Sequence, residues 1–263
     1  MKRFLVPALL LLSSALAAAP TLPRAPGGDS SSFVLRSGQP DLAWTICDAV
    51  DQPQVIVVGQ PDASGRTEVS TFSKTNPGSY TYQAYRLGQA DPGAGQVYYS
   101  LTPRNGSTGA QPGNVHAVNP GMLDNPAQVL TPPVTGVQLS GQPAAQCRWV
   151  PGLRLLGFTA RRSFTVTQDV GGRLTYQSFD FAAVPGVRVL PRSGVGATST
   201  PSQTVGGGRA RRAGGRETFT FSNAGYTYTI SVDDRGEGSL AVARGGHTLQ
   251  SERLNGYTHA LPR

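Results

Sequence analysis

The sequence of 263 residues is poor in several residue types, with only two cysteines, two methionines, two tryptophans and three histidines. It contains no G-x-S-x-G segment, no phosphate-binding loop of the G-x-x-x-x-G-K-[ST] type and no dinucleotide fingerprint. None of the histidines has a partner at a metal-ligand spacing such as H-x-x-x-H, so we expect no metal and no cofactor. We interpret His116, His247 and His259 as exposed polar residues. No catalytic residue can be named from these patterns.

Long apolar runs are also missing, because no stretch after residue 19 approaches the roughly 20 apolar residues of a membrane helix. At the N-terminus, Lys2 and Arg3 precede a short apolar run over residues 4–12, and small residues follow it. This order is typical of a secretory signal peptide. We predict a signal peptide over residues 1–19, cleaved after Ala17, and a mature protein without a membrane span that is soluble and either periplasmic or secreted.

Export determines the expected redox state of the two cysteines. No cysteine ends the signal segment, which argues against a lipid anchor, and thiols in an oxidising compartment normally pair. We predict a disulfide between Cys47 and Cys147, which in the chain-entropy model stabilises a loop of about 100 residues by up to roughly 4.7 kcal/mol. Trp44 and Trp149 lie close to these cysteines in sequence, so we expect the two indoles to pack together in the core around the disulfide and to join two strands there. The alternative is an aromatic platform for a sugar ring, which requires an exposed indole face.

No helical periodicity of useful length is present, whereas short β-branched and aromatic runs are bounded by Gly, Pro, Asn and Ser. The pattern predicts an all-β protein, an antiparallel sandwich or barrel-like assembly. We expect a flexible leader over residues 20–32, a β-rich domain over residues 33–191 and a Gly/Arg-rich linker or long loop over residues 192–216. Residues 217–263 are predicted to form a C-terminal four-stranded β-meander that packs on the preceding region.

One hairpin is predicted within the β-rich domain. Residues 163–170 and 173–181 read as strands, and between them lie Gly171 and Gly172. Glycine adopts the positive φ values that a two-residue primed turn needs. The sequence therefore predicts a two-residue turn at this position.

The meander carries the clearest alternation of apolar and polar residues, so its register can be predicted. If residues 222–225 form a four-residue loop, Phe221 lies opposite Tyr226. A two-residue loop in the next hairpin would place Val242 opposite Leu249. Both arrangements keep the apolar side chains on one face.

Basic residues outnumber acidic ones, 23 to 15, for a formal net charge of +8. The densest run is arginine in a Gly- and Ala-rich setting and comprises Arg209, Arg211, Arg212 and Arg216. Guanidinium groups bind phosphates through paired donors, so this run is a candidate contact for a polyanion. The alternative is a solvated linker. Aromatic residues for base stacking are absent from the run, which argues against nucleic acid as a partner.

Together these features favour an exported soluble β-domain that serves as a non-enzymatic binding or structural component of the bacterial cell envelope. Its partner would be an envelope polymer or protein. One alternative is a secreted hydrolase acting on envelope glycan or peptide, since a glycosidase needs only two carboxylates about 5 to 9 Å apart. A further alternative is an inhibitor of an external enzyme.

Overall fold

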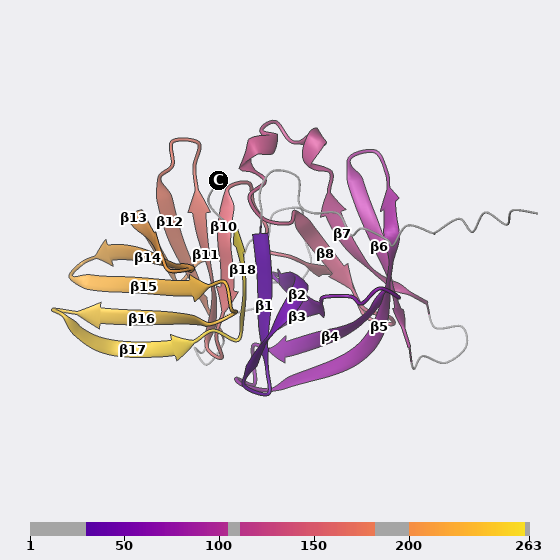
Figure 1. Cartoon of the computed structure of the whole chain (residues 1–263), viewed down its shortest axis with the longest axis horizontal. Coiled ribbons are helices and arrows are strands. Elements are labelled where there is room, and N and C mark those ends of the chain that lie inside the picture. Colours follow the sequence, from indigo (N-terminus) through magenta and orange to yellow (C-terminus); the bar gives the residue numbers. More distant parts are fainter. Residues whose placement is uncertain (1–29, 105–110, 182–199, 261–263) are drawn as a thin grey trace, which may run out of the picture.

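The computed structural model describes residues 30–104, 111–181 and 200–260. The predicted signal peptide and nearly all of the predicted leader lie outside these ranges. Within them the chain forms 18 strands and two short 3-10 helices, and the strands join into one antiparallel sheet (Figure 1). The prediction of an all-β antiparallel fold is therefore confirmed. The sheet is open, and it curls twice to form two lobes.

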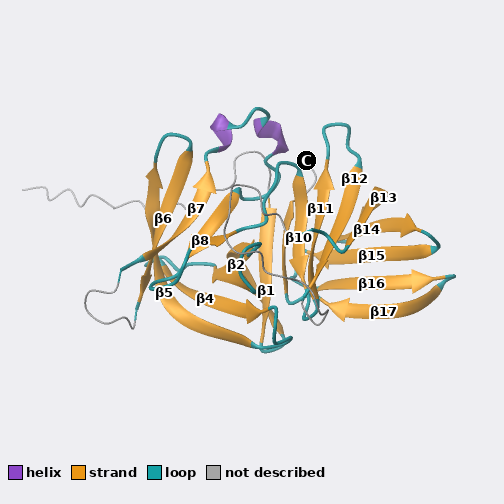
Figure 2. Cartoon of the chain, turned by 180° about the vertical axis from the view of Figure 1, so that it is seen from behind, coloured by secondary structure: helices purple, strands orange, loops and turns teal. Residues whose placement is uncertain are grey.

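The N-terminal lobe consists of eight strands, each paired with the next along the chain. Every second residue of these strands points inward, and the sheet curls around a single cluster that includes Ile56, Tyr85, Leu101 and Val115. The two 3-10 helices lie at one end of the strands (Figure 2). The elements are β2 (Gln39–Asp48), β3 (Gln54–Gly59), β4 (Arg66–Ser73), β5 (Tyr80–Pro92), β6 (Gln96–Pro103), β7 (Gly113–Val118), η1 (Pro120–Met122), η2 (Pro126–Gln128), β8 (Val134–Gln138) and β9 (Ala145–Gln146).

The C-terminal lobe consists of ten strands in the order β1, β18 and then β10 to β17. They curl around a second cluster, which includes Phe164, Tyr176, Phe219, Ile230 and Leu240. The strands are β1 (Ser30–Arg36), β10 (Leu153–Phe158), β11 (Arg162–Gln168), β12 (Leu174–Asp180), β13 (Gln203–Ala213), β14 (Arg216–Asn223), β15 (Tyr226–Asp233), β16 (Gly238–Arg244), β17 (His247–Arg253) and β18 (Gly256–Ala260).

Strand β1 joins the lobes, because it pairs with β18 on one side and with β2 on the other. Figure 1 shows it between the two curls. A third apolar cluster fills the junction and includes Val34, Ile46, Val57 and Phe158. There the ring of Phe158 meets the ring of Phe72 edge-on, with centroids 5.0 Å apart. The lobes therefore share an apolar seam in addition to a continuous sheet.

The predicted disulfide is confirmed, with the Cα atoms of Cys47 and Cys147 4.8 Å apart. Cys147 also forms an isolated antiparallel bridge with Ala49, so the chain after β9 returns to the end of β2. The indoles do not meet around this bond. A β-bulge after Ala43 shifts the register of β2 and lets Trp44 share the face of Cys47 in the N-terminal cluster, whereas Trp149 packs against the junction cluster.

The predicted linker over residues 192–216 is wrong for its described part. Gln203–Ala213 form β13, and β14 begins at Arg216. Glycine is needed here for packing: a Cβ atom on Gly208 would lie 2.1 Å from the ring of Phe221. The predicted leader is likewise wrong for its last three residues, because β1 begins at Ser30.

The meander β14–β17 is confirmed, but the predicted register of its first hairpin is off by two residues. Phe221 lies opposite Tyr228 rather than Tyr226. The loop has two residues, Ala224 and Gly225, with φ angles of 48° and 81°. These values are those of a type I′ turn, the tightest connection that matches the strand twist. Both registers keep the aromatic rings on the same face, so the alternation could not distinguish them.

Two other turns also differ in detail from the predictions. The loop between β16 and β17 does have two residues, but a bulge beyond it pairs Val242 with Gln250 and leaves Leu249 60% exposed. In the hairpin β11–β12, the amide of Gly172 bonds the carbonyl of Asp169, and the Asp169 carboxylate accepts from the amide of Arg173. The hairpin is confirmed, with a longer loop than the predicted two-residue turn.

Candidate functional site

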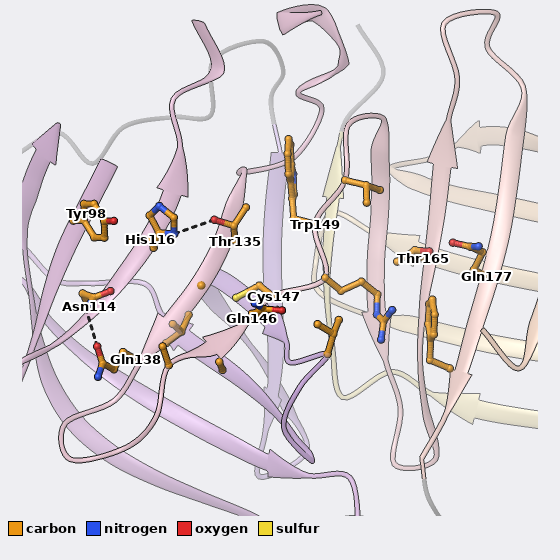
Figure 3. Close-up of a pocket in the computed structure, with 18 of the residues that line it drawn as sticks. Tyr98, Asn114, His116, Thr135, Gln138, Gln146, Cys147, Trp149, Thr165 and Gln177 are labelled. Carbon is orange, nitrogen blue, oxygen red and sulfur yellow. Dashed lines mark hydrogen bonds between the residues drawn. The ribbon is translucent and has the colours of Figure 1, made fainter. Parts of the chain in front are cut away.

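A groove of about 770 Å³ lies between the lobes, and both lobes contribute to its walls (Figure 3). The outward side chains of β6, β7 and β8 form one wall, those of β11 and β12 form the other, and the chain from β9 to β10 lies between them. The lining residues are Val50, Tyr98, Asn114, His116, Thr135, Gly136, Val137, Gln138, Ala144, Ala145, Gln146, Cys147, Arg148, Trp149, Val150, Thr165, Gln177, Phe179 and Pro201.

The first wall is built on a cross-strand row in which Tyr98 lies opposite His116 and His116 lies opposite Gly136. Their neighbours Val115 and Ala117 point into the N-terminal core, so this row points outward. The rings of Tyr98 and His116 stack, with centroids 4.7 Å apart and planes 18° apart. Gly136 carries no side chain, which leaves a slot over Gly136 beside the other face of the imidazole, bounded by the carbonyl oxygen of Ala145.

The protonation of His116 follows from its surroundings. Burial lowers the pKa of His116, and the imidazole is neutral at neutral pH. Its Nδ1 atom lies 3.2 Å from the hydroxyl of Thr135. If that hydroxyl donates to Nδ1, the proton of the ring sits on Nε2 and is available as a donor.

The second wall comes from a cross-strand pair of the C-terminal lobe, Thr165 on β11 and Gln177 on β12. Phe164 and Val166 on either side of Thr165 are core residues, so alternation turns Thr165 and Gln177 away from that core. Figure 3 shows both side chains across the groove from His116, with Trp149 between the walls.

A buried ion cluster holds Arg148, one of the residues that line the groove. The carboxylate of Asp48 lies 2.5 Å from Nζ of Lys74 and 2.6 Å from Nε of Arg148, and the Ser163 hydroxyl donates to it at 2.6 Å. Burial raises the pKa of Asp48, but these two charges and hydrogen bonds to Lys74 and Ser163 outweigh burial and hold the pKa below its usual range. The guanidinium of Arg148 stacks on the ring of Phe179 at 3.4 Å. The one arginine in the described lining is thus paired with a carboxylate, which it shares with Lys74.

Three polar atoms of the groove residues are buried and have no hydrogen-bond partner among the residues that the structure describes: Nε2 of His116, Nε1 of Trp149 and Oγ1 of Thr165. A buried polar group left unpaired costs about 1–3 kcal/mol. Three such atoms around one groove favour a site at which a ligand or water completes the bonds.

The described lining of the groove contains no Asp or Glu. It therefore offers no pair of carboxylates for acid–base catalysis, and its chemistry is that of amides, hydroxyls, an imidazole and aromatic rings. Nor does any group of three or more His, Cys, Asp and Glu residues in the described parts of the chain come together to hold a metal ion.

The interpretation of His259 as an exposed residue is wrong. It is 1% exposed in the C-terminal core, and its Nε2 atom lies 2.6 Å from the carboxylate of Glu217. Arg154 pairs with the same carboxylate at 2.5 Å. Burial raises the pKa of Glu217, but the hydrogen bond with His259 and the charge of Arg154 outweigh it and lower the pKa. Enclosed in the core, this cluster is structural. Since β18 brings His259 to β14 only through the fold, no local pattern indicated the pairing.

The structure divides the four arginines of the predicted polyanion contact. Arg212 binds Asp234 and Arg216 binds Asp233, each at 2.9 Å. Arg209 and Arg211 lie exposed on β13, opposite Thr220 and Thr218. These four residues lie outside the groove lining, and their contact with a polyanion stays a prediction.

Comparisons with protein-family models, with curated proteins and with solved structures find no match to this chain. Within its described residues, no helix is both long and apolar enough to cross a membrane. Apart from His116, Cys147 and Trp149, the groove residues were not singled out by sequence reasoning. The alternation of Val115 and Ala117 with His116 indicates an outward histidine, but no local signal shows that this face lies across from β11 and β12.

Proposed function

We propose that this protein is an exported, non-enzymatic binding component of the bacterial cell envelope and that it holds its ligand in the inter-lobe groove. The observation that carries the proposal is the groove, with its volume of about 770 Å³ and its lining of amides, hydroxyls and aromatic rings from both lobes. Ligand sites commonly have this size, and they favour seams between structural units. Export is supported by the signal-like N-terminus and by the disulfide, since disulfides persist in oxidising compartments.

Binding is favoured over hydrolysis by the chemistry of the described lining. A glycosidase requires two carboxylates across its cleft, and the groove supplies none within the described residues. Cys47 and Cys147 are bonded to each other, so neither sulfur serves as a nucleophile. The remaining polar groups, amides and hydroxyls, can hold a ligand by hydrogen bonds.

The test is retention of envelope polymers by the oxidised, processed protein on a solid support. The variant His116→Ala removes the imidazole from the groove, and the control His247→Ala removes an exposed one from β17. We expect the control to retain the polymer as the parent does and His116→Ala to retain about tenfold less. Equal retention by the two variants, or retention of no envelope fraction by the parent, overturns the proposal. Release of shortened fragments over time would instead establish a hydrolase.

A further inference from the structure

We infer that the ligand of the groove is an uncharged, hydroxyl-rich glycan segment, one ring of which lies in the slot above Gly136 beside the imidazole of His116. The inference rests on the proposed function and names the chemistry of its ligand. Its support comes from the charge of the groove, its hydrogen-bonding groups, its shape and the state of its backbone.

The charge balance of the groove points to a neutral ligand. The described lining has no carboxylate, and its arginine, Arg148, is bound to the buried carboxylate of Asp48 and stacked on Phe179. His116 is uncharged at neutral pH because burial lowers its pKa. A cationic ligand entering this groove would lose hydration without gaining a carboxylate partner, and an anionic ligand would meet a single guanidinium that is already held by Asp48 and Phe179.

The hydrogen-bonding groups suit a ligand with many hydroxyls. A hydroxyl both donates and accepts, and so do the side-chain amides in the groove and the Thr165 hydroxyl. The amides come from both walls and the floor, on Asn114, Gln138, Gln146 and Gln177. Asn114 donates to the side-chain oxygen of Gln138 at 3.2 Å, and the amide nitrogen of Gln138 donates to the carbonyl of Gln142 at 3.3 Å, which leaves its second N–H for a ligand. The unpaired Thr165 Oγ1 and Trp149 Nε1 atoms lie on the same groove.

The slot offers one face of the His116 imidazole to a ring of the ligand. Tyr98 covers one face of the His116 imidazole, and the other face looks over Gly136. A Cβ atom added to Gly136 would lie 3.5 Å from the carbonyl oxygen of Ala145, 3.6 Å from Cβ of His116 and 3.7 Å from its Nδ1 atom, all at ordinary contact distance. The space above Gly136 is therefore bounded by the imidazole at van der Waals range. The C–H face of a sugar ring packs on an aromatic ring in this way and leaves its hydroxyls at the edge for polar groups.

The backbone of the groove argues against an extended peptide as the ligand. Peptides bind to sheets by adding a strand to a free edge. The chain from β9 to β10, which forms the floor of the groove, already has its backbone groups hydrogen-bonded within the protein. The amide of Val50 donates to the carbonyl of Gln146, the amide of Cys147 to that of Thr135 and the amide of Arg148 to that of Asp48. Recognition in the groove is left to side chains.

Two matched pairs of variants test the inference in calorimetric titrations of the oxidised protein. Thr165→Val removes an unpaired buried hydroxyl while keeping the shape of the side chain, and Thr220→Val makes the same change on β14 outside the groove. Gly136→Ala places a methyl group in the slot, and Gly206→Ala adds one on β13, where no atom of the described ranges lies within 4 Å of it. Thermal unfolding of each variant checks the fold. Loss of an unsatisfied group should leave Thr165→Val as stable as the parent or more stable.

The probes are neutral oligosaccharides of glucose and of N-acetylglucosamine, a polyphosphate, and an uncharged peptide. We expect a neutral oligosaccharide to bind the parent and both controls alike. Thr165→Val and Gly136→Ala should each weaken that binding about tenfold or more, although Thr165→Val does not destabilise the fold. If Thr165 had only a structural role, its replacement would not weaken binding while leaving the stability of the fold unchanged.

Other outcomes overturn the inference in distinguishable ways. If the polyphosphate or the peptide binds and the groove variants weaken it, or if an envelope fraction binds in the groove while no neutral oligosaccharide does, the ligand chemistry is wrong and the proposed function stands. If neither the probes nor the envelope fractions show binding that depends on the groove, both fail. Binding of neutral oligosaccharide that is unchanged by Thr165→Val and Gly136→Ala places the ligand elsewhere and refutes the inference.

Discussion

Replacing Asp48 with asparagine should destabilise the protein strongly, because the carboxylate compensates two buried cations. It is 0% exposed and contacts Lys74, Arg148 and Ser163. Removing one partner of a buried ion pair typically costs about 3–5 kcal/mol, since the remaining charge stays desolvated. For a protein of this size about 1 kcal/mol shifts Tm by about 2–4 °C. We therefore expect Asp48→Asn to lower Tm by about 6–20 °C.

The control is Glu237→Gln, which breaks the exposed pair of Glu237 with Arg253, in which the side chains are 46% and 47% exposed. Surface pairs contribute about 0–1 kcal/mol, so Tm should fall by at most about 4 °C. The assay is thermal unfolding under oxidising conditions, followed by tryptophan fluorescence, because Trp149 packs at the junction of the lobes. A Tm for Asp48→Asn that matches the control refutes the assignment. The double variant Asp48→Asn with Lys74→Met should recover part of the loss, because it removes one of the uncompensated charges.

The same carboxylate gives a pH dependence with a defined sign. Its folded pKa is lowered, so its contribution to the free energy of unfolding is present above the unfolded value of about 3.9 and is lost as the pH falls through the folded value. The difference in stability between the parent and Asp48→Asn should therefore stay constant from about pH 5 to pH 8 and shrink only below about pH 4. A difference that instead disappears between pH 6 and 8 would point to another titrating group.

Three further predictions concern the backbone and the disulfide. Reducing the bond between Cys47 and Cys147, which closes a loop with a sequence separation of 100, should lower the free energy of unfolding by up to about 4.7 kcal/mol in urea titrations; no change on reduction would contradict a structural role. Gly256→Ala would place its Cβ atom 2.7 Å from an aromatic carbon, so it should cost about 1–3 kcal/mol, whereas Gly206→Ala, with open space around it, should not. Ala224→Asn should stabilise the turn by about 0.5–1 kcal/mol because asparagine tolerates the φ of 48° better than alanine; a lower Tm for this variant would contradict that reading.

The sequence predicted those strands in which apolar and polar residues alternate, because the alternation shows which face is buried. Phe219 and Phe221 alternate with threonines, and the strand that carries them was placed correctly because a period of two reports the buried face directly. The predicted register was wrong, because a shift of two residues keeps the same face buried. Which of the two registers forms depends on Ala224 adopting a positive φ. A pattern cannot rank two turns that bury the same side chains.

The other failures share a physical origin in contacts between segments that are far apart in the sequence. The Gly-rich run around Gly208 predicts a linker until the ring of Phe221 is placed against it. The groove is a still stronger case: the alternation of strands shows that His116 and Thr165 point out of their own lobes, but not that these two outward faces lie across from each other. Only the disulfide was predictable at long range, because the chain offers Cys47 a single partner, Cys147.

The pairing of β1 with β18 has a consequence for the order of folding. The hydroxyls of Ser32 and Thr258 bond across a sequence separation of 226, so one of the first strands to be synthesised has a partner among the last. Closing a loop of that length costs about 5 kcal/mol of chain entropy before any contact offsets it. We therefore expect the pairing of β1 with β18 to form late in folding, after the strand pairs that are close in sequence.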